Sequence, residues 1–167
     1  MLKLILLIVV SFYVGGCTAR SSSLAKANTK IEPCSLLTKE EAAAALNGNI
    51  EVSLTADPRT CGYSLVAPGS ANTARYASIV VVVVTPDSPD FQKFGSSQDE
   101  RTDAKPIAGV GDKAVLFMSK VSPDKGAKAM HVLKGNLYLG IGMSTSTPPV
   151  SEDVLKSLAV KAVSRLP

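Results

Sequence analysis

The pattern of apolar and polar residues divides the chain into an apolar start, a polar stretch and a long patterned region. Residues 4–14 are almost entirely apolar, whereas residues 18–31 are rich in Ser, Thr, Ala, Lys and Asn and show no apolar periodicity. After them, apolar runs of strand or helix length alternate with turn residues, and no repeat or linker interrupts the alternation. We therefore expect a flexible tether over residues 17–31 and one globular domain over residues 32–167.

The strongest strand signal is the run of six β-branched residues at 79–84. A run without a polar face predicts a central strand that is covered on both sides, with a helix packed on at least one of them. Shorter apolar segments bounded by turn residues predict further strands at 50–55, 60–66 and 115–118. The Gly-x-Gly sequence at 109–111 lacks a third glycine and a following Gly-Lys-Ser/Thr, so we interpret it as a tight turn and not as a phosphate loop.

Two of the predicted helices lie near the ends of the domain. Thr38 and Glu41 have the spacing of a capping box, and Asn47 follows the alanine-rich segment behind them as a helix stop. The second helix begins after Ser151, and its buried stripe consists of Leu155, Leu158, Ala162 and Leu166. The fold class is therefore predicted to be α+β, an antiparallel sheet of about five to seven strands packed with an N-terminal and a C-terminal helix.

The segment 128–144 predicts a β-hairpin, because two apolar runs are joined by a Gly-Asn pair at 135–136 that suits a two-residue turn. In this register His131 pairs with Gly140. Alternate residues of a strand point to opposite faces, so the hairpin has a core face and a second face. The residues predicted on the core face are Met130, Val132, Leu139 and Ile141.

The second face of this hairpin contains a candidate ligand groove. Gly140 and Gly142 leave a strip without side chains, which suggests that something approaches the backbone closely. His131 and Tyr138 are diagonal neighbours that would wall a shallow groove for a small or extended ligand. Two lysines near the rim would favour an anionic ligand: Lys128 and Lys134. The alternative occupant of the strip is the C-terminal helix, through its small residues Ala159 and Ala162.

The first seventeen residues contain a basic start, an apolar run and two glycines followed by Cys17, the parts of a secretory signal peptide. The apolar run of about eleven residues is too short to cross a bilayer, which takes about twenty. Val14-Gly15-Gly16-Cys17 resembles the lipobox of bacterial lipoproteins, although Val and Gly stand where Leu and Ala are commoner. The resemblance implies that residues 1–16 are removed and that Cys17 receives a lipid. The alternative is an ordinary secreted protein with a stray thiol.

Charge and cysteine content limit the partners and the compartment. The chain has 18 Lys and Arg against 14 Asp and Glu, a formal net charge of +4. This excess is small and not clustered, so we expect no nucleic-acid partner. With Cys17 assigned to lipid, Cys34 and Cys61 are the remaining pair, and an even number of cysteines in an exported protein predicts a structural disulfide. A redox-active pair is the alternative, but the sequence has no Cys-x-x-Cys.

Three motifs of the domain resemble those of a class of small bacterial cell-envelope lipoproteins. They are the cysteine-started helix at 33–42, the Cys-Gly-Tyr sequence at 61–63 and the Gly-x-Gly-Asp-x-Ala turn at 109–114. The resemblance runs over most of the mature domain and implies a sheet packed with helices, similar to the PsbP-like α/β sandwich. The class has no agreed catalytic residues, so the resemblance implies none here.

These observations predict a membrane-anchored, non-catalytic lipoprotein that binds or scaffolds a component of the cell envelope. The sequence has one histidine and no Gly-x-Ser-x-Gly, and we expect no metal and no cofactor. A small exported enzyme is the alternative. The expected partners are the membrane, through the lipid on Cys17, and an envelope polymer, lipid or protein. The expected location is the outer membrane of a Gram-negative host or the outer face of the plasma membrane of a Gram-positive host.

Overall fold

The computed structural model describes residues 30–66, 77–93, 103–118, 127–145 and 149–167. The predicted signal peptide, Cys17 and all but the last two residues of the predicted tether lie outside these ranges.

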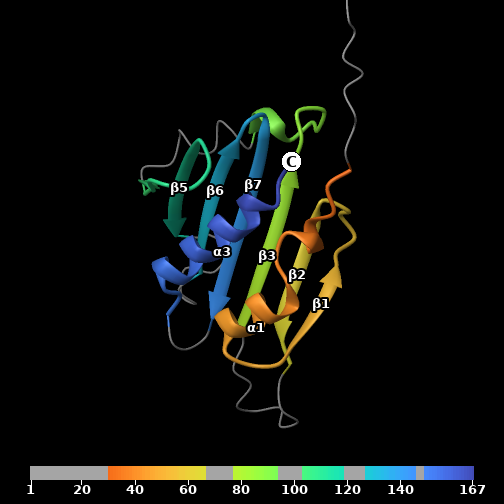
Figure 1. The fold of residues 1–167 in the computed structure, drawn as a ribbon, viewed down its shortest axis with the longest axis vertical. Coiled ribbons are helices and arrows are strands. Elements are labelled where there is room, and N and C mark those ends of the chain that lie inside the picture. The colour runs from red at the N-terminus through yellow and green to blue at the C-terminus, as the bar shows by residue number, and fades with distance from the viewer. Residues whose placement is uncertain (1–29, 67–76, 94–102, 119–126, 146–148) are drawn as a thin grey trace, which may run out of the picture.

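Seven strands form one antiparallel sheet in the order β1-β2-β3-β7-β6-β5-β4 (Figure 1). The predicted antiparallel sheet is confirmed. The two longest strands, β3 and β7, pair at its centre, where the predicted run of β-branched residues lies. The strands are β1 (Ile50–Leu54), β2 (Thr60–Leu65), β3 (Ala77–Val84), β4 (Lys105–Pro106), β5 (Lys113–Met118), β6 (Lys128–Lys134) and β7 (Leu137–Thr145).

The helices lie on one face of this sheet (Figure 1). They are the 3-10 helix η1 (Pro33–Ser35) and the α-helices α1 (Lys39–Leu46) and α3 (Glu152–Ser164). Helix α3 contacts β6 and β7, and α1 contacts β1, β2 and β3. Buried side chains of both α-helices and of the sheet form one hydrophobic core.

The local signals at the helix ends explain where the helices start and stop. The predicted capping box of α1 is confirmed: the backbone N–H of Glu41 donates to the Thr38 hydroxyl, and the Thr38 N–H donates to the Glu41 carboxylate. Asn47 ends the helix in the left-handed conformation, with φ of 53°. Ser151 occupies the predicted N-cap position of α3, but its side chain makes no capping hydrogen bond.

The predicted disulfide between Cys34 and Cys61 is confirmed, with the Cα atoms 5.1 Å apart. It joins η1 to β2. The hydroxyl of Tyr63, two residues further along β2, donates to the carbonyl oxygen of Leu37 at 2.8 Å. Burial of this phenol raises the pKa of Tyr63. The N-terminal elements are therefore attached to β2 both covalently and through a buried hydrogen bond.

The predicted hairpin register is confirmed, since Lys134 pairs with Leu137 and His131 pairs with Gly140. Gly135 provides the positive φ of the turn, at 58°. The predicted Gly-x-Gly turn precedes β5, and its Asp112 holds the hairpin turn. The Asp112 carboxylate accepts from the Gly135 N–H at 2.6 Å, and the Asp112 N–H donates to the carbonyl of Leu133 at 2.8 Å.

One prediction about the central strand is wrong. The run at 79–84 was expected to be covered on both faces, and its residues facing the helices are indeed buried. On the other face, however, Val80 is 38% exposed. Its neighbours across the sheet are Gly62 in β2 and Gly142 in β7. Because neither glycine has a side chain to cover it, Val80 stays partly in contact with solvent.

Candidate functional site

The structure places His131, Tyr138 and Gly140 on the face of the sheet opposite the helices, as the hairpin register predicted. The predicted alternative, that the C-terminal helix covers the glycine strip, is wrong. Ala159 of α3 is buried in the core on the other face of the sheet, as is its neighbour one turn later, Ala162. A Cβ added at Gly142 would have no heavy atom within 4 Å, so this part of the strip is open.

Two further aromatic side chains pack against the walls of the predicted groove. Neither was among the predicted groove residues. The ring of Phe117 meets His131 edge-on, with centroids 4.6 Å apart. The ring of Phe91 meets Tyr138 at a tilt, with centroids 4.9 Å apart. Gly140, between these pairs, is buried. The three predicted residues are therefore brought close together, but the open part of the strip lies further along, at Gly142.

The two lysines predicted at the rim of this groove lie on the other face of the sheet. Lys128 and Lys134 are each three residues from His131 along β6. Because alternate residues of a strand point to opposite faces, both lysines lie on the face of the core residues. Lys128 lies 3.6 Å from the carboxylate of Glu152 at the start of α3, and Lys134 lies 3.9 Å from Asp112. Both lysines are an even number of residues from Met130, so their side chains point to the core face of the sheet. Neither lysine is therefore placed to attract an anionic ligand to the glycine strip, which lies on the opposite face.

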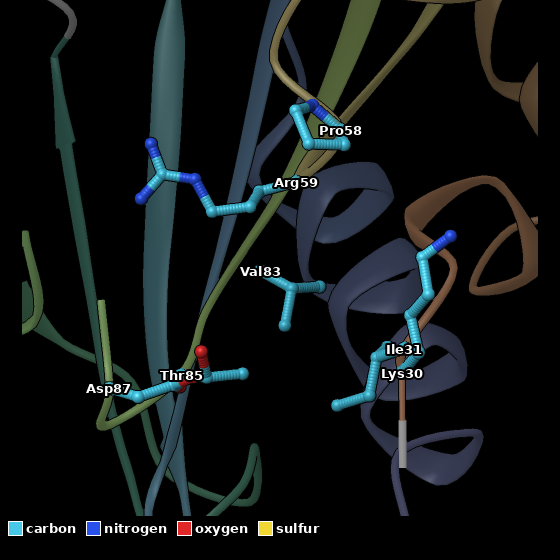
Figure 2. A pocket seen from close by; sticks show the side chains of 7 residues that line it. All are labelled: Lys30, Ile31, Pro58, Arg59, Val83, Thr85 and Asp87. Atoms are coloured by element: carbon cyan, nitrogen blue, oxygen red, sulfur yellow. The ribbon is translucent and has the colours of Figure 1, made fainter. Parts of the chain in front are cut away.

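A pocket of about 330 Å³ lies where residue 30 enters the domain (Figure 2). Figure 2 shows Val83 of β3 between two walls. One wall comes from the chain before η1 and the other from the β1–β2 turn and the segment after β3. Its lining residues are Lys30, Ile31, Pro58, Arg59, Val83, Thr85 and Asp87. None of them was a predicted site residue, although Val83 belongs to the predicted strand at 79–84.

Arg59 fixes the shape of this pocket. Its Nε and Nη2 atoms donate to the Asp57 carboxylate, and Nη1 donates to Asp90 at 2.9 Å and to the Ser88 hydroxyl at 2.6 Å. The carboxylates of Asp57 and Asp90 raise the pKa of the Arg59 guanidinium further above its ordinary value, and the bonds from Arg59 to Asp57 lower the pKa of Asp57. In Figure 2 the guanidinium points away from Lys30. Arg59 thus links the β1–β2 turn to the segment after β3 at the border of the pocket.

The remaining lining is mixed in chemistry. Ile31, Pro58 and Val83 are apolar, and Thr85 and Asp87 provide oxygen atoms. Lys30 pairs with Glu32 at 2.8 Å, an interaction that raises the pKa of Lys30. A volume near 330 Å³ is at the lower end of the range of small-molecule sites, about 300–1,000 Å³. The pocket can therefore take a small ligand, or part of a larger one, that has an apolar body and a polar end.

Within the described ranges, no group of three or more His, Cys, Asp and Glu side chains is arranged to hold a metal ion. None of the helices described is both long enough and apolar enough to cross a membrane. Comparison with known protein families, with curated proteins and with solved structures finds no match to this chain.

Proposed function

We propose that this chain is a lipid-anchored, non-catalytic binding or scaffolding protein of the bacterial cell envelope. The observation that carries the proposal is the Cys34–Cys61 disulfide. Stable structural disulfides belong to oxidising compartments outside the cytoplasm, so the bond supports export. It also leaves Cys17, the last residue of the lipobox-like sequence, as the third cysteine of the chain. Lipid on Cys17 with two or three acyl chains would hold the protein on the membrane.

We further propose that the fold is of the PsbP-like type. A sheet with helices on one face supports an α+β domain over residues 32–167 that is similar to the PsbP-like sandwich. The three motifs that resemble small envelope lipoproteins all have a place in this structure. The first provides the capping box and the disulfide, the second places Tyr63 in the core, and the third holds the hairpin turn.

The pocket beside Lys30 is the binding site that the geometry favours. The proposed tether over residues 17–31 ends with Lys30 and Ile31, and both of these residues line the pocket. A flexible tether of this length would span about 20 Å on average, which would keep the pocket close to the lipid headgroups. We therefore propose a small amphipathic ligand from the envelope, with its apolar part against Val83 and Ile31 and its polar end near Asp87.

The anchoring half of the proposal is tested by phase separation in detergent. The exported wild-type protein is expected in the detergent phase, and the Cys17→Ser variant is expected in the aqueous phase. Because the substitution removes only the acceptor sulfur, the folded domain stays unchanged as an internal control. Recovery of unmodified wild-type protein in the aqueous phase would contradict the anchor and leave an ordinary secreted protein.

The binding half is tested by amide NMR during titration with lipid headgroup analogues, short acyl compounds and peptidoglycan fragments. A true ligand should shift Ile31, Thr85 and Asp87, and Val83→Phe should weaken binding at least tenfold by filling the pocket. Val80→Phe, on the opposite face of the same strand, is the matched control and should bind normally. Shifts clustered at His131, Tyr138 and Gly140 would instead favour the glycine strip, and chemical turnover of a fragment would favour the exported-enzyme alternative.

A further inference from the structure

The charges around the pocket beside Lys30 favour one class of ligand. The described charged side chains that line this pocket, or that pair with its lining, are four carboxylates and two cations: Glu32, Asp57, Asp87 and Asp90, with Lys30 and Arg59. They leave a local formal charge of −2, and counting Lys93 from the segment of Asp87 still leaves an excess of one carboxylate. Because a cleft lined by one sign of charge concentrates ligands of the opposite sign, this excess favours a cation.

The guanidinium of Arg59 is the group to which an anionic ligand would be expected to bind, and its donors are already engaged. All three of its nitrogen atoms donate within the described structure, Nε and Nη2 to Asp57 and Nη1 to Asp90 and Ser88. An anion would have to compete with two carboxylates for charge-assisted hydrogen bonds that are already formed. Arg59 therefore supports the wall of the pocket and is poorly suited to receive an anion.

The ammonium of Lys30 offers an anion no better partner. It lies 2.8 Å from the carboxylate of Glu32, and the Lys30 side chain is 80% exposed, so solvent screens its charge strongly. Figure 2 shows this ammonium turned away from Val83, which lies between the two walls of the pocket. An anion bound to Lys30 would therefore lie away from the apolar part of the pocket.

The wall opposite Lys30 presents oxygen atoms next to the apolar contacts. Thr85 directly follows β3, and it lines the pocket together with Asp87. Figure 2 shows the side chain of Ile31 directed across the pocket towards Thr85, with Val83 between the walls. A ligand with its apolar part against Ile31 and Val83 therefore presents its polar end to a hydroxyl and a carboxylate. An ammonium group has three donors and no acceptor, so it matches these oxygen atoms.

We propose that the ligand of this pocket carries a primary ammonium group on an apolar body, with the ammonium at Asp87 and Thr85. The proposal rests on the binding function proposed above for the pocket, and it adds the chemical class of the polar end. Lipids with an amine headgroup and small free amines share this chemistry. The apolar body of either would lie against Val83 and Ile31.

Short-chain lipids distinguish the two sources of the ammonium group. Dihexanoylphosphatidylethanolamine carries an ammonium, whereas dihexanoylphosphatidylglycerol has the same acyl chains and no ammonium. Amide NMR shifts at Ile31, Thr85 and Asp87 with the first lipid alone would identify a lipid headgroup. Shifts with hexylammonium but with neither lipid would identify a small free amine, and both results support the proposal. Tighter binding of dihexanoylphosphatidylglycerol would overturn it.

Three probes with the same hexyl group test the sign of the charge: hexylammonium, 1-hexanol and heptanoate. At pH 7 the amine is protonated and the carboxylic acid is ionised. In amide NMR titrations of the exported protein, followed at Ile31, Thr85 and Asp87, hexylammonium is expected to bind at least ten times more tightly than heptanoate. Equal affinities, or tighter binding of heptanoate, would overturn the ammonium proposal while leaving the pocket a binding site. No shift at the pocket with any probe would overturn the binding function as well.

Substitution of Asp87 tests the position of the ammonium group. Asp87→Asn removes the charge and keeps the size, so it is expected to weaken hexylammonium binding at least fivefold and to leave 1-hexanol binding unchanged. The matched control is Asp103→Asn, which removes the same charge from an exposed residue that does not line this pocket and should leave all three affinities unchanged. Wild-type amide shifts away from the pocket would show that Asp87→Asn is folded. Equal losses of hexylammonium binding in the two variants would mean a general effect of charge and would overturn the proposed position.

Discussion

Glu41 links the first and last helices of the domain, and its protonation should control a measurable part of the stability. Arg165, just after α3, donates from Nη1 and Nη2 to the two carboxylate oxygens of Glu41, at 2.7 and 2.8 Å. The same Nη1 atom also donates to the carbonyl of Leu36 at 2.8 Å. The Glu41 side chain is only 17% exposed, so solvent screens these bonds weakly.

The size of the effect follows from the pKa of Glu41. The two bonds from Arg165 are the main cause that lowers this pKa from 4.5 to about 2, with burial acting in the opposite direction. At about 1.36 kcal/mol per pKa unit, this difference sets an upper limit of about 3.4 kcal/mol on the contribution to stability. Residual screening of the ion pair reduces the expected value to about 1–2 kcal/mol.

The sign of the pH dependence is fixed by the direction of the shift. Because the pKa of Glu41 is lower in the folded chain than in the unfolded chain, its contribution is fully present above about pH 5.5 and is lost as the pH falls towards 2. The free energy of unfolding measured with urea should therefore be about 1–2 kcal/mol lower for Glu41→Gln than for the wild type at pH 7. The two values should converge near pH 2.

The matched control is Glu40→Gln, which removes the same charge from the same first turn of α1. Glu40 is not among the hydrogen-bond partners of Arg165 in the described structure, so this variant should retain most of the wild-type stability at pH 7. If the difference in the free energy of unfolding between the wild type and Glu41→Gln stays constant from pH 7 to pH 2.5, the reasoning is refuted. Equal losses in the two variants would show that the effect arises from the helix dipole and not from Arg165.

Two further predictions concern the covalent link and the turn before β5. Replacing Cys34 and Cys61 together by alanine should lower the free energy of unfolding by about 3.5 kcal/mol, because the bond closes a loop between residues 27 positions apart; an unchanged urea midpoint would contradict this. Gly111→Ala should destabilise the domain far more than Gly109→Ala in thermal unfolding. Both glycines have positive φ, but only the Cβ at position 111 would meet the Leu133 carbonyl and Val132, at 2.5 Å, and similar midpoints would contradict this.

The features that could be predicted from the sequence are those fixed by neighbouring residues. The capping box at Thr38 and Glu41 and the hairpin turn at Gly135 depend on side chains within a few positions of each other. The pairing of His131 with Gly140 then follows from counting outward from the turn. The disulfide followed from a count of cysteines once Cys17 was set aside.

The features that could not be predicted depend on which distant segments meet. The strand β4 consists of Lys105 and Pro106, which have no strand signal of their own, because its pairing with β5 is decided by the position of β5 and not by its own composition. The pocket beside Lys30 combines three segments without a shared local signal. The prediction that Lys128 and Lys134 lie at the rim of the groove could have been avoided from the sequence alone. The alternation of side chains that places Met130 on the core face places both lysines on that face too.

The central pairing of β3 with β7 has a consequence for how fast the chain folds. Every pair in this ladder joins residues that are more than fifty positions apart, from Ala77 with Thr145 to Val84 with Tyr138. Pairing over such separations requires costly loop closure before any contact is gained, so domains built on it fold slowly. For the export proposed above, this delay would help the chain to cross the membrane before it folds. The centre of the sheet cannot form until β7, close to the end of the chain, is available to pair with β3.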